Sequence, residues 1–334
     1  MMPGSGSRPG SEMADYTAIS RGEWIALADR FYAKLDRTFA MFSPEEWALA
    51  TPYLGWRAHD ILAHMTSAIR INFRQVLDRA LSGNPSAPPE FNTFARNARE
   101  VARHRTTPVA DLLREFHAEL DAIMSIYRGM NDDDWLRPAW FFVGRVQVRT
   151  LFLVQLADNV VHERDLLVAS DRWRGFDATW TEPLVDWFLR ELRPALFRPE
   201  RAENLRARVL YRLSGPLGGE WTLVVADGRC HVERGATGDH DVVVEADAED
   251  VVVSAQARAA PWIGTLARSA QWIRGPARAE DVVAKITGLA ALAGALAQRR
   301  LRVGGDRQIA RRLTGAFWHF WQRTEMTARN IAKG

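Results

Sequence analysis

The spacing of the apolar residues changes once along the chain, near residue 200. Before this point they recur every three to four residues, the period of an α-helix, and after it they alternate with polar residues, the period of a β-strand. Segments of the first kind bury an apolar stripe against other helices, and segments of the second kind bury one face of a sheet. The sequence therefore predicts a helical domain followed by an α+β domain.

Four helices with one apolar stripe each are predicted in the first part, and such helices are best buried against one another as a four-helix bundle. Ser20 and Glu23 form a capping box at the start of the first helix, and Pro108 suits the first position of the third. The predicted helices begin after Ser20, run from Gly55-Trp56 to about Leu81, begin after Thr107-Pro108 and span about 146–169, and a further amphipathic stretch covers 181–197.

The second part reads as strands and helices. Residues 207–213 alternate as a half-buried strand does, and Asp227-Gly228 between two apolar runs predicts a hairpin. Asp247, at the end of another strand, can cap the helix that follows it. Two further short strands, QWIR and RLRV, are alternatives for closing the sheet. We expect a flexible tail over 1–13, the bundle over 14–200 and the α+β domain over 204–334.

Composition argues against several classes of function. The net charge of +3 is carried by arginines interspersed with acids, so nucleic acid is not the expected partner. The longest apolar run, 286–297, is too short to span a bilayer, and the N-terminal tail lacks the apolar core of a signal peptide. Cys230 is the only cysteine, which fits a reducing compartment. We therefore predict a cytoplasmic protein without a membrane partner.

One side of the fourth helix carries ligand-type residues. Asp158 and His162 are four residues apart, so their side chains lie on the same face and could bind one ion. The second helix offers His59 and His64, which lie about 140° apart around the helix axis and cannot both face inward. His64 shares the inward stripe with Ile61 and is the better candidate. His64, Asp158 and His162 would make a site for Zn²⁺ or another divalent ion, with open coordination positions.

The same residues carry a family resemblance. GWRAHDILAHM, residues 55–65, resembles the first signature of the DinB-like superfamily, in particular its mycothiol-dependent maleylpyruvate isomerase branch, and DNVVHERDLL resembles the second. The resemblance implies a metal-binding bundle with His64, Asp158 and His162 as ligands. Two departures stand out: Asp158 replaces the usual glutamate, and Arg57 replaces a capping Thr or Ser. More loosely, the C-terminal half resembles the sterol-carrier-protein-like fold that often follows this bundle in actinobacterial proteins.

A metal held by two imidazoles and one carboxylate keeps a net positive charge and would favour a bound thiolate. Because no cysteine is suited to be the nucleophile, the thiol would come from a cofactor, and the resemblance implies mycothiol or a related low-molecular-weight thiol. The expected reaction is addition of this thiolate to an electrophile, either cis–trans isomerisation of a maleylpyruvate-like acid or S-transfer. Arg70 and Arg74 could pair with carboxylates of the bound molecules.

Other interpretations stay open. His64 could be a hydrogen-bonded core histidine, and Asp158 with His162 a salt pair on a solvated face. Asp165 could orient a metal-bound imidazole or only cap and pair locally. The protein as a whole could be a carrier of an apolar ligand in its second domain, or a metal-binding stress protein without turnover. We interpret the remaining candidates as structural or exposed residues: His59 at the surface, His104, His117, Cys230 in a strand, and the aromatic cluster at 317–321.

Overall fold

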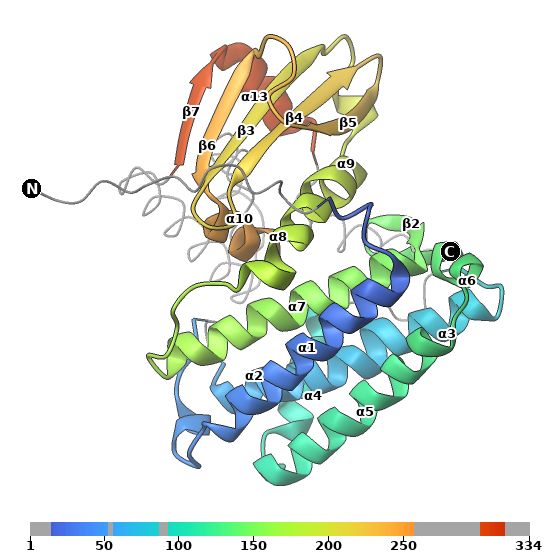
Figure 1. Cartoon of the computed structure of the whole chain (residues 1–334), viewed down its shortest axis with the longest axis vertical. Helices are drawn as coiled ribbons and strands as arrows, with labels where there is room; N and C mark the ends of the chain where they lie inside the picture. Colours follow the sequence, from blue (N-terminus) through green and yellow to red (C-terminus); the bar gives the residue numbers. More distant parts are fainter. Residues whose placement is uncertain (1–14, 53–55, 87–92, 257–300, 318–334) are drawn as a thin grey trace, which may run out of the picture.

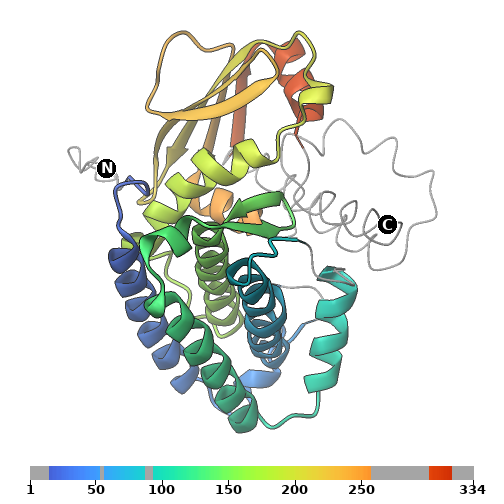
Figure 2. The ribbon, with the colours of Figure 1, turned by 90° about the vertical axis from the view of Figure 1, so that its right-hand side faces the viewer.

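A computed structural model describes residues 15–52, 56–86, 93–256 and 301–317. Figure 1 shows a helical bundle below a twisted sheet, with a broken helix running between them, and the view turned by 90° shows the same two parts (Figure 2). Helical elements occupy the described chain from Arg21 to Arg201, and the large sheet begins at Ala207. The predicted order, a helical domain followed by an α+β domain, is confirmed.

The bundle helices start and stop close to the sequence signals. The Ser20–Glu23 capping box is formed in both directions, and Asp60 accepts the backbone N–H of Arg57 at the start of the second helix. That second helix is continuous to Leu81 but passes through a π-helical segment. The elements are α1 Arg21–Ala40, η1 Glu46–Ala48, α2 Ala58–Ala68, the π segment η2 Ile69–Arg74, α3 Gln75–Leu81, α5 Val109–Gly129 and α7 Val148–Ala169.

Besides the short 3-10 turns, two helices and one hairpin of the helical part were not predicted from the sequence. They are α4 Thr93–His104, α6 Asp132–Leu136, and a small antiparallel hairpin of β1 Pro138–Phe141 and β2 Gly144–Gln147. The helix α4 is mostly polar, and α6 and the two strands are four or five residues long, so none has a long apolar pattern. The hairpin turns at Phe142-Val143, and Gly144 directly after the turn has a φ of 113°, which suits glycine.

The helix between the two parts contacts both of them. It consists of α8 Ala178–Trp187, the π segment η3 Phe188–Leu192 and α9 Arg193–Ala195, followed by the short turn η4 Pro199–Arg201. It packs on α1 and α7 on one side and on the sheet on the other. The predicted amphipathic stretch at 181–197 therefore forms, and its buried apolar residues belong to one continuous hydrophobic core that includes residues of both the bundle and the sheet.

The sheet has the strand order β5-β4-β3-β6-β7, antiparallel except for the β3–β6 pair. Asp227 and Gly228 both have positive φ and make the predicted hairpin turn, and Asp247 caps the following helix through the Glu249 N–H. Leu301, Arg302 and Val303 of RLRV belong to the strand beside β6, whereas Arg300 and all of QWIR lie outside the described residues. The elements are β3 Ala207–Ser214, β4 Gly219–Ala226, β5 Arg229–Arg234, β6 Val242–Asp247, α10 Ala248–Gln256, β7 Leu301–Gly305 and α13 Arg307–Gly315.

The two faces of the sheet differ. Trp221 and its same-face neighbours are buried towards the helices, while the opposite face carries charged pairs such as Arg212 with Glu220 and Glu245. Leu210, Thr222 and Val224 on this opposite face are buried as well, so it combines exposed charged pairs with buried side chains.

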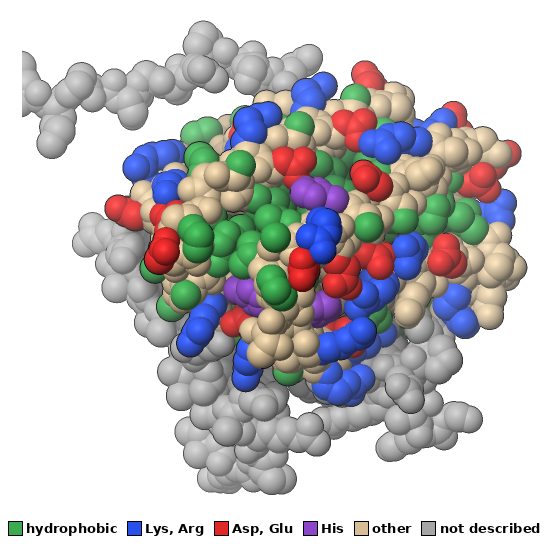
Figure 3. All heavy atoms as spheres, turned by 90° about the horizontal axis from the view of Figure 1, so that it is seen from below, with side chains coloured by type: hydrophobic (Ala, Val, Ile, Leu, Met, Phe, Trp, Pro, Cys, Tyr) green, Lys and Arg blue, Asp and Glu red, His purple; other side chains and the backbone are tan. Residues whose placement is uncertain are grey.

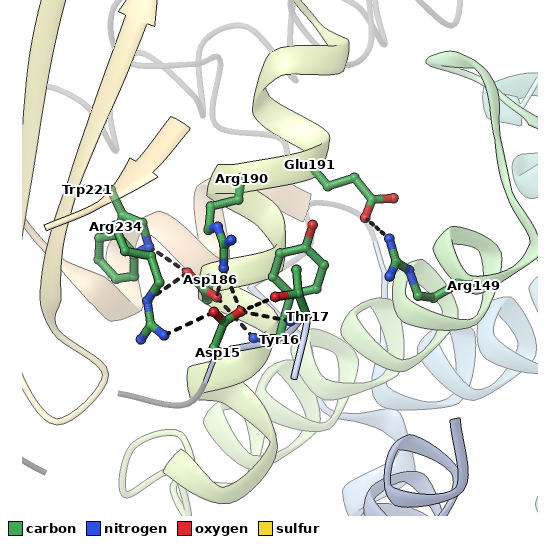
Figure 4. Close-up of polar contacts among 9 residues, drawn as sticks. All are labelled: Asp15, Tyr16, Thr17, Arg149, Asp186, Arg190, Glu191, Trp221 and Arg234. Atoms are coloured by element: carbon green, nitrogen blue, oxygen red, sulfur yellow. Dashed lines mark hydrogen bonds and ion pairs between the residues drawn. The ribbon is translucent and has the colours of Figure 1, made fainter. Parts of the chain in front are cut away.

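A polar network joins the N-terminal segment, the bridging helix and the sheet (Figure 4). Asp186 of α8 is fully buried and accepts hydrogen bonds from Trp221 Nε1 at 2.8 Å, from the Tyr16 N–H at 3.1 Å and from Arg190 at 3.0 Å. Asp15 contacts Arg190 at 2.6 Å, and Arg234 of β5 completes the group. Three segments distant in sequence are therefore held by one buried carboxylate.

None of the described helices combines the length and apolar composition that a membrane-spanning helix needs. Acidic, basic and apolar side chains are interspersed over the end of the bundle seen in Figure 3. Phe317, the first residue of the aromatic cluster, is buried against Phe197; the rest of that cluster lies outside the described residues.

Candidate metal centre

The helices α2 and α7 pack against each other and bring three ligand-type side chains together. His64 comes from the inward face of α2, and Asp158 and His162 come from successive turns of α7. Both histidines are buried, with relative exposures of 7% and 5%, whereas the Asp158 side chain is 24% exposed. The site is thus a buried pair of imidazoles with a carboxylate on the side that reaches solvent.

The distances in this triad fit an ion better than direct hydrogen bonds. Oδ2 of Asp158 lies 3.8 Å from Nε2 of His64, and Oδ1 lies 3.6 Å from Nε2 of His162. Both separations exceed a hydrogen bond. Two ligand atoms that each lie about 2.0–2.2 Å from Zn²⁺ would be separated by roughly 3.4–3.7 Å at tetrahedral to trigonal angles. One atom from each residue lies within 4.8 Å of the other two, so the donor set suits a divalent ion.

Asp165 fixes the orientation of one imidazole. Its Oδ2 lies 3.3 Å from Nδ1 of His162. If Nδ1 carries the proton and donates to the carboxylate, the Nε2 lone pair is left facing Asp158 and His64. This is the arrangement in which a carboxylate holds a metal-binding histidine in the required tautomer. Of the two interpretations of Asp165, the contact favours the one in which it orients the imidazole.

The other imidazole is oriented by aromatic packing. The ring centroids of His64 and His162 are 4.8 Å apart with planes at 80°, and the Trp56 ring lies 5.1 Å from that of His64. An edge-to-face arrangement keeps the two imidazoles from stacking. As a result, their Nε2 atoms converge on Asp158.

A second polar cluster, missed in the sequence, lies one turn away on α7. Gln155 and Asn159 donate hydrogen bonds of 3.1 and 3.0 Å to the hydroxyl of Tyr32 on α1. All three side chains are buried, and burial raises the pKa of the Tyr32 phenol to about 12. Gln155 lies on the same side of α7 as Asp158 and His162, and this spacing was the available signal. Its partner Tyr32 on α1 could not be predicted from that spacing.

Arg70 and Arg74, predicted to meet substrate carboxylates, are held by glutamates of the protein. Arg70 pairs with Glu115 at 2.6 Å and Glu100 at 3.1 Å, and Arg74 pairs with Glu119 at 2.8 Å. No contact between these guanidinium groups and the triad occurs among the described residues. A substrate anion would have to displace a glutamate of the protein to bind either arginine.

The other histidines in the described part of the bundle have structural partners. The prediction of a surface His59 is wrong in part: its ring is half-buried, and Nε2 lies 2.8 Å from the Thr107 carbonyl oxygen, because the loop before α5 covers the start of α2. His104 is buried, 3.8 Å from Glu115, and His117 is exposed and pairs with Asp36. Neither joins the triad.

Residues 28–167 match the family model of the mycothiol maleylpyruvate isomerase N-terminal domain. This segment begins within α1 and ends within α7, so it includes all three ligand candidates. The helical bundle is similar to this domain family over these residues. The family resemblance found in the two histidine-containing signatures is thereby confirmed for the N-terminal domain.

One solved structure agrees with this similarity at the level of the fold. A crystal structure of a mycothiol-dependent maleylpyruvate isomerase is 14% identical, with a TM-score of 0.50, and covers 73% of this chain and 93% of its own. A histidine-to-alanine mutant of that enzyme gives 16% identity and a TM-score of 0.49, covering 73% and 91%. The crystal structure with the TM-score of 0.50 covers 73% of this chain, which is more than residues 28–167. Its similarity in fold therefore extends beyond the part of the chain that matches the family model.

A UbiJ-SCP2 ubiquinone synthesis protein also matches, at 17% identity over 44% of this chain and 90% of its own, with a TM-score of 0.22. Its name agrees with the sterol-carrier-protein-like resemblance of the second domain, but so low a TM-score supports no argument. No curated protein matches the sequence at a significant level.

Proposed function

We propose that this protein is a divalent-metal-dependent enzyme that activates a low-molecular-weight thiol, most simply mycothiol, for addition to an electrophilic substrate. The observation that carries the proposal is the convergence of His64, Asp158 and His162 within a domain of the mycothiol maleylpyruvate isomerase N-terminal family. The solved structures of similar fold are of a mycothiol-dependent maleylpyruvate isomerase, which suggests the same reaction class here.

The chain supplies the ligands and the surroundings of the metal. Two neutral imidazoles and one carboxylate would leave a bound divalent ion with a net positive charge, and fewer than the four ligands of a closed structural zinc site. When bound, such an ion lowers the pKa of a thiol at an open position. Asp165 keeps His162 in the ligand tautomer, and the exposed side of Asp158 is where a small molecule can approach.

The protein's own thiol is unsuited to the reaction. Cys230 lies on β5, in the other domain, and burial raises its pKa to about 12. A thiol with so high a pKa is almost entirely protonated at neutral pH and is a poor nucleophile. The nucleophile is therefore assigned to a bound cofactor.

Two outcomes of the addition are chemically distinct. In isomerisation, the thiol adds across the C=C bond of a cis acid, rotation follows about the resulting single bond, and loss of the thiol regenerates the double bond. The thiol is recovered unchanged. In S-transfer, the adduct is released and one thiol is consumed per turnover. Zn²⁺, mycothiol and a maleylpyruvate-like acid are the proposed first choices for metal, cofactor and substrate.

The test begins with metal analysis of the purified protein. We expect about one divalent ion per chain in wild type, little in His64→Ala and His162→Ala, and wild-type content in the control His117→Ala. Turnover of maleylpyruvate is then measured with and without mycothiol, following both the trans product and free thiol. Turnover that requires both metal and thiol supports the proposal.

Two results would contradict it. A protein without bound metal, and without activity after addition of Zn²⁺, Ni²⁺ or Mn²⁺, would favour a carrier function of the second domain. Stoichiometric metal without thiol-dependent turnover of any electrophile tested would favour a metal-binding protein that does not catalyse this reaction.

A further inference from the structure

The carboxylate of Asp165 lies between two side chains of its own helix. Its Oδ2 faces Nδ1 of His162 at 3.3 Å, and its Oδ1 accepts a hydrogen bond from a terminal nitrogen of Arg164 at 3.1 Å. Asp165 is 3% exposed and the Arg164 side chain is 22% exposed. A buried carboxylate is costly unless it is paired, and here a cation and an imidazole hold its two oxygens.

The contact between Arg164 and Asp165 is not a default of helix geometry. Neighbouring residues of an α-helix point about 100° apart and do not face each other. The long side chain of Arg164 must therefore bend around the helix to reach Asp165. Such a conformation needs support from outside the helix.

That support comes from the segment after α7. The Arg164 guanidinium lies 5.9 Å from the centre of the Trp173 ring, within the range of a cation–π interaction. Trp173 packs edge-to-face on Phe176 at 4.7 Å, and the Phe176 N–H donates to Glu249 of α10 at 3.1 Å. The far end of the chain of contacts is thus fixed by the second domain.

We infer that Arg164 is a positioning residue for the metal ligand His162, acting through Asp165 and held in place by Trp173. The inference rests on the proposed function, since it assigns His162 to a metal. Arg164 balances the charge of Asp165, so the carboxylate stays buried with its oxygen against Nδ1 of His162. The imidazole is then held with Nε2 directed at the metal.

Removing the guanidinium has a specific consequence. The buried Asp165 carboxylate would lose the cation that pairs with its Oδ1, which favours a turn of the carboxylate towards water. His162 would lose its orienting partner and bind metal more weakly. The effect of Arg164 on the metal should therefore depend on the presence of Asp165.

The experiment is a titration of metal-free protein with Co²⁺, following the visible absorption of the bound ion. Wild type is compared with Arg164→Met, Arg164→Lys, Asp165→Asn and the double variant Arg164→Met/Asp165→Asn. Arg114→Met is the matched control, because Arg114 makes an exposed ion pair with Asp111 on α5, away from α7. Trp173→Leu tests the support of Arg164, and thermal unfolding confirms that each variant is folded.

For Asp165→Asn we expect a Co²⁺ affinity lower by about 10- to 100-fold, the usual cost of losing a ligand's hydrogen-bonding partner. For Arg164→Met we expect a smaller loss of Co²⁺ affinity, about 5- to 10-fold, together with a changed Co²⁺ spectrum. Arg164→Lys should reduce the affinity less than Arg164→Met does. In a protein that already carries Asp165→Asn, Arg164→Met should lower the Co²⁺ affinity little further, because the two residues act on His162 as one unit. Trp173→Leu should weaken binding in the same direction, and Arg114→Met should not.

Two results separate the possible failures. In the first, wild type binds Co²⁺ in a His64-dependent way, but Arg164→Met keeps the wild-type affinity and spectrum, or its loss of affinity is fully additive with that of Asp165→Asn. This result would overturn the inference about Arg164 alone. Wild type that binds no Co²⁺, or binds it equally well as His64→Ala, would overturn the proposed function together with it.

Discussion

Oδ1 of Asp158 and Nε2 of His162 lie 3.6 Å apart on successive turns of α7, too far for a hydrogen bond and close enough to bind one ion. The first prediction follows from this relationship. Asp158→Asn removes the anionic ligand, and we expect a loss of metal affinity beyond the roughly 10- to 100-fold caused by losing a ligand's hydrogen-bonding partner. Asp158→Glu, which restores the residue usual in the resembling family, should still bind. Isothermal titration with Zn²⁺ measures both, and equal affinities of wild type and Asp158→Asn would contradict the assignment.

Two buried tyrosine hydroxyls, one on α1 and one on α5, should respond differently to removal. The Tyr32 hydroxyl accepts hydrogen bonds from Gln155 and Asn159, whereas that of Tyr127 has no hydrogen-bond partner among the described residues. Tyr32→Phe would leave two buried amides without their acceptor, at about 1–3 kcal/mol each in the free energy of unfolding. Tyr127→Phe should change it by less than about 0.5 kcal/mol. Urea unfolding of the two variants provides the measurement, and similar losses would contradict the polar cluster.

The buried carboxylate of Asp186 should dominate the stability of the junction drawn in Figure 4. Asp186→Asn replaces a carboxylate that accepts several hydrogen bonds with a neutral amide that is itself partly a donor. We expect the free energy of unfolding to fall by about 3–5 kcal/mol, as for a buried ion pair that loses one partner. Asp227→Asn is the control, since Asp227 pairs with Arg206 while both are exposed, and should cost less than about 1 kcal/mol. Urea unfolding compares them, and equal effects would show that the network does not hold the junction.

Protonation of Asp15 should reduce the stability of this junction in acid. Burial works to raise the pKa of Asp15, but hydrogen bonds from Thr17 and Arg190 outweigh it and lower the pKa from 3.8 to about 2. Because the folded pKa lies below the unfolded one, the stabilisation is present above about pH 4 and is lost as the pH falls towards 2. The difference in unfolding free energy between wild type and Asp15→Asn should be constant from pH 7 to 5 and shrink below pH 4. A difference that grows in acid would contradict this sign.

Cys230 should be unreactive in the folded protein. Because burial raises its pKa to about 12, little thiolate is present at pH 8. Iodoacetamide should label the native protein slowly and the protein in urea quickly, with the label counted by mass spectrometry. Fast labelling of the native protein would reopen Cys230 as a nucleophile and remove one reason for assigning the thiol to a cofactor.

Much of this arrangement could be predicted from the sequence, because it is set by local periodicity. The spacing of four residues between Asp158 and His162 places them on one face of any α-helix, and the 140° between His59 and His64 allows only one to face inward. The Ser20–Glu23 capping box and the Asp227-Gly228 turn are likewise properties of short segments, and both are present.

Contacts between distant segments could not be predicted in this way. Nothing in the spacing of Arg70 shows that Glu115 would hold it, and nothing in that of Gln155 shows that Tyr32 would receive its hydrogen bond. In both cases the deciding partner lies on another helix. Its position depends on how the helices pack and not on any local signal.

The sequence by itself determined the two fold classes, the helix faces and the three residues suited to a metal, because each follows from the geometry of a single element. Only the tertiary structure decided that α2 and α7 bring His64 to Asp158 and His162, and that Asp186 joins the N-terminal segment to the sheet. The physical reason is that a helix fixes the directions of its side chains, whereas burial of apolar faces between elements fixes which side chains meet.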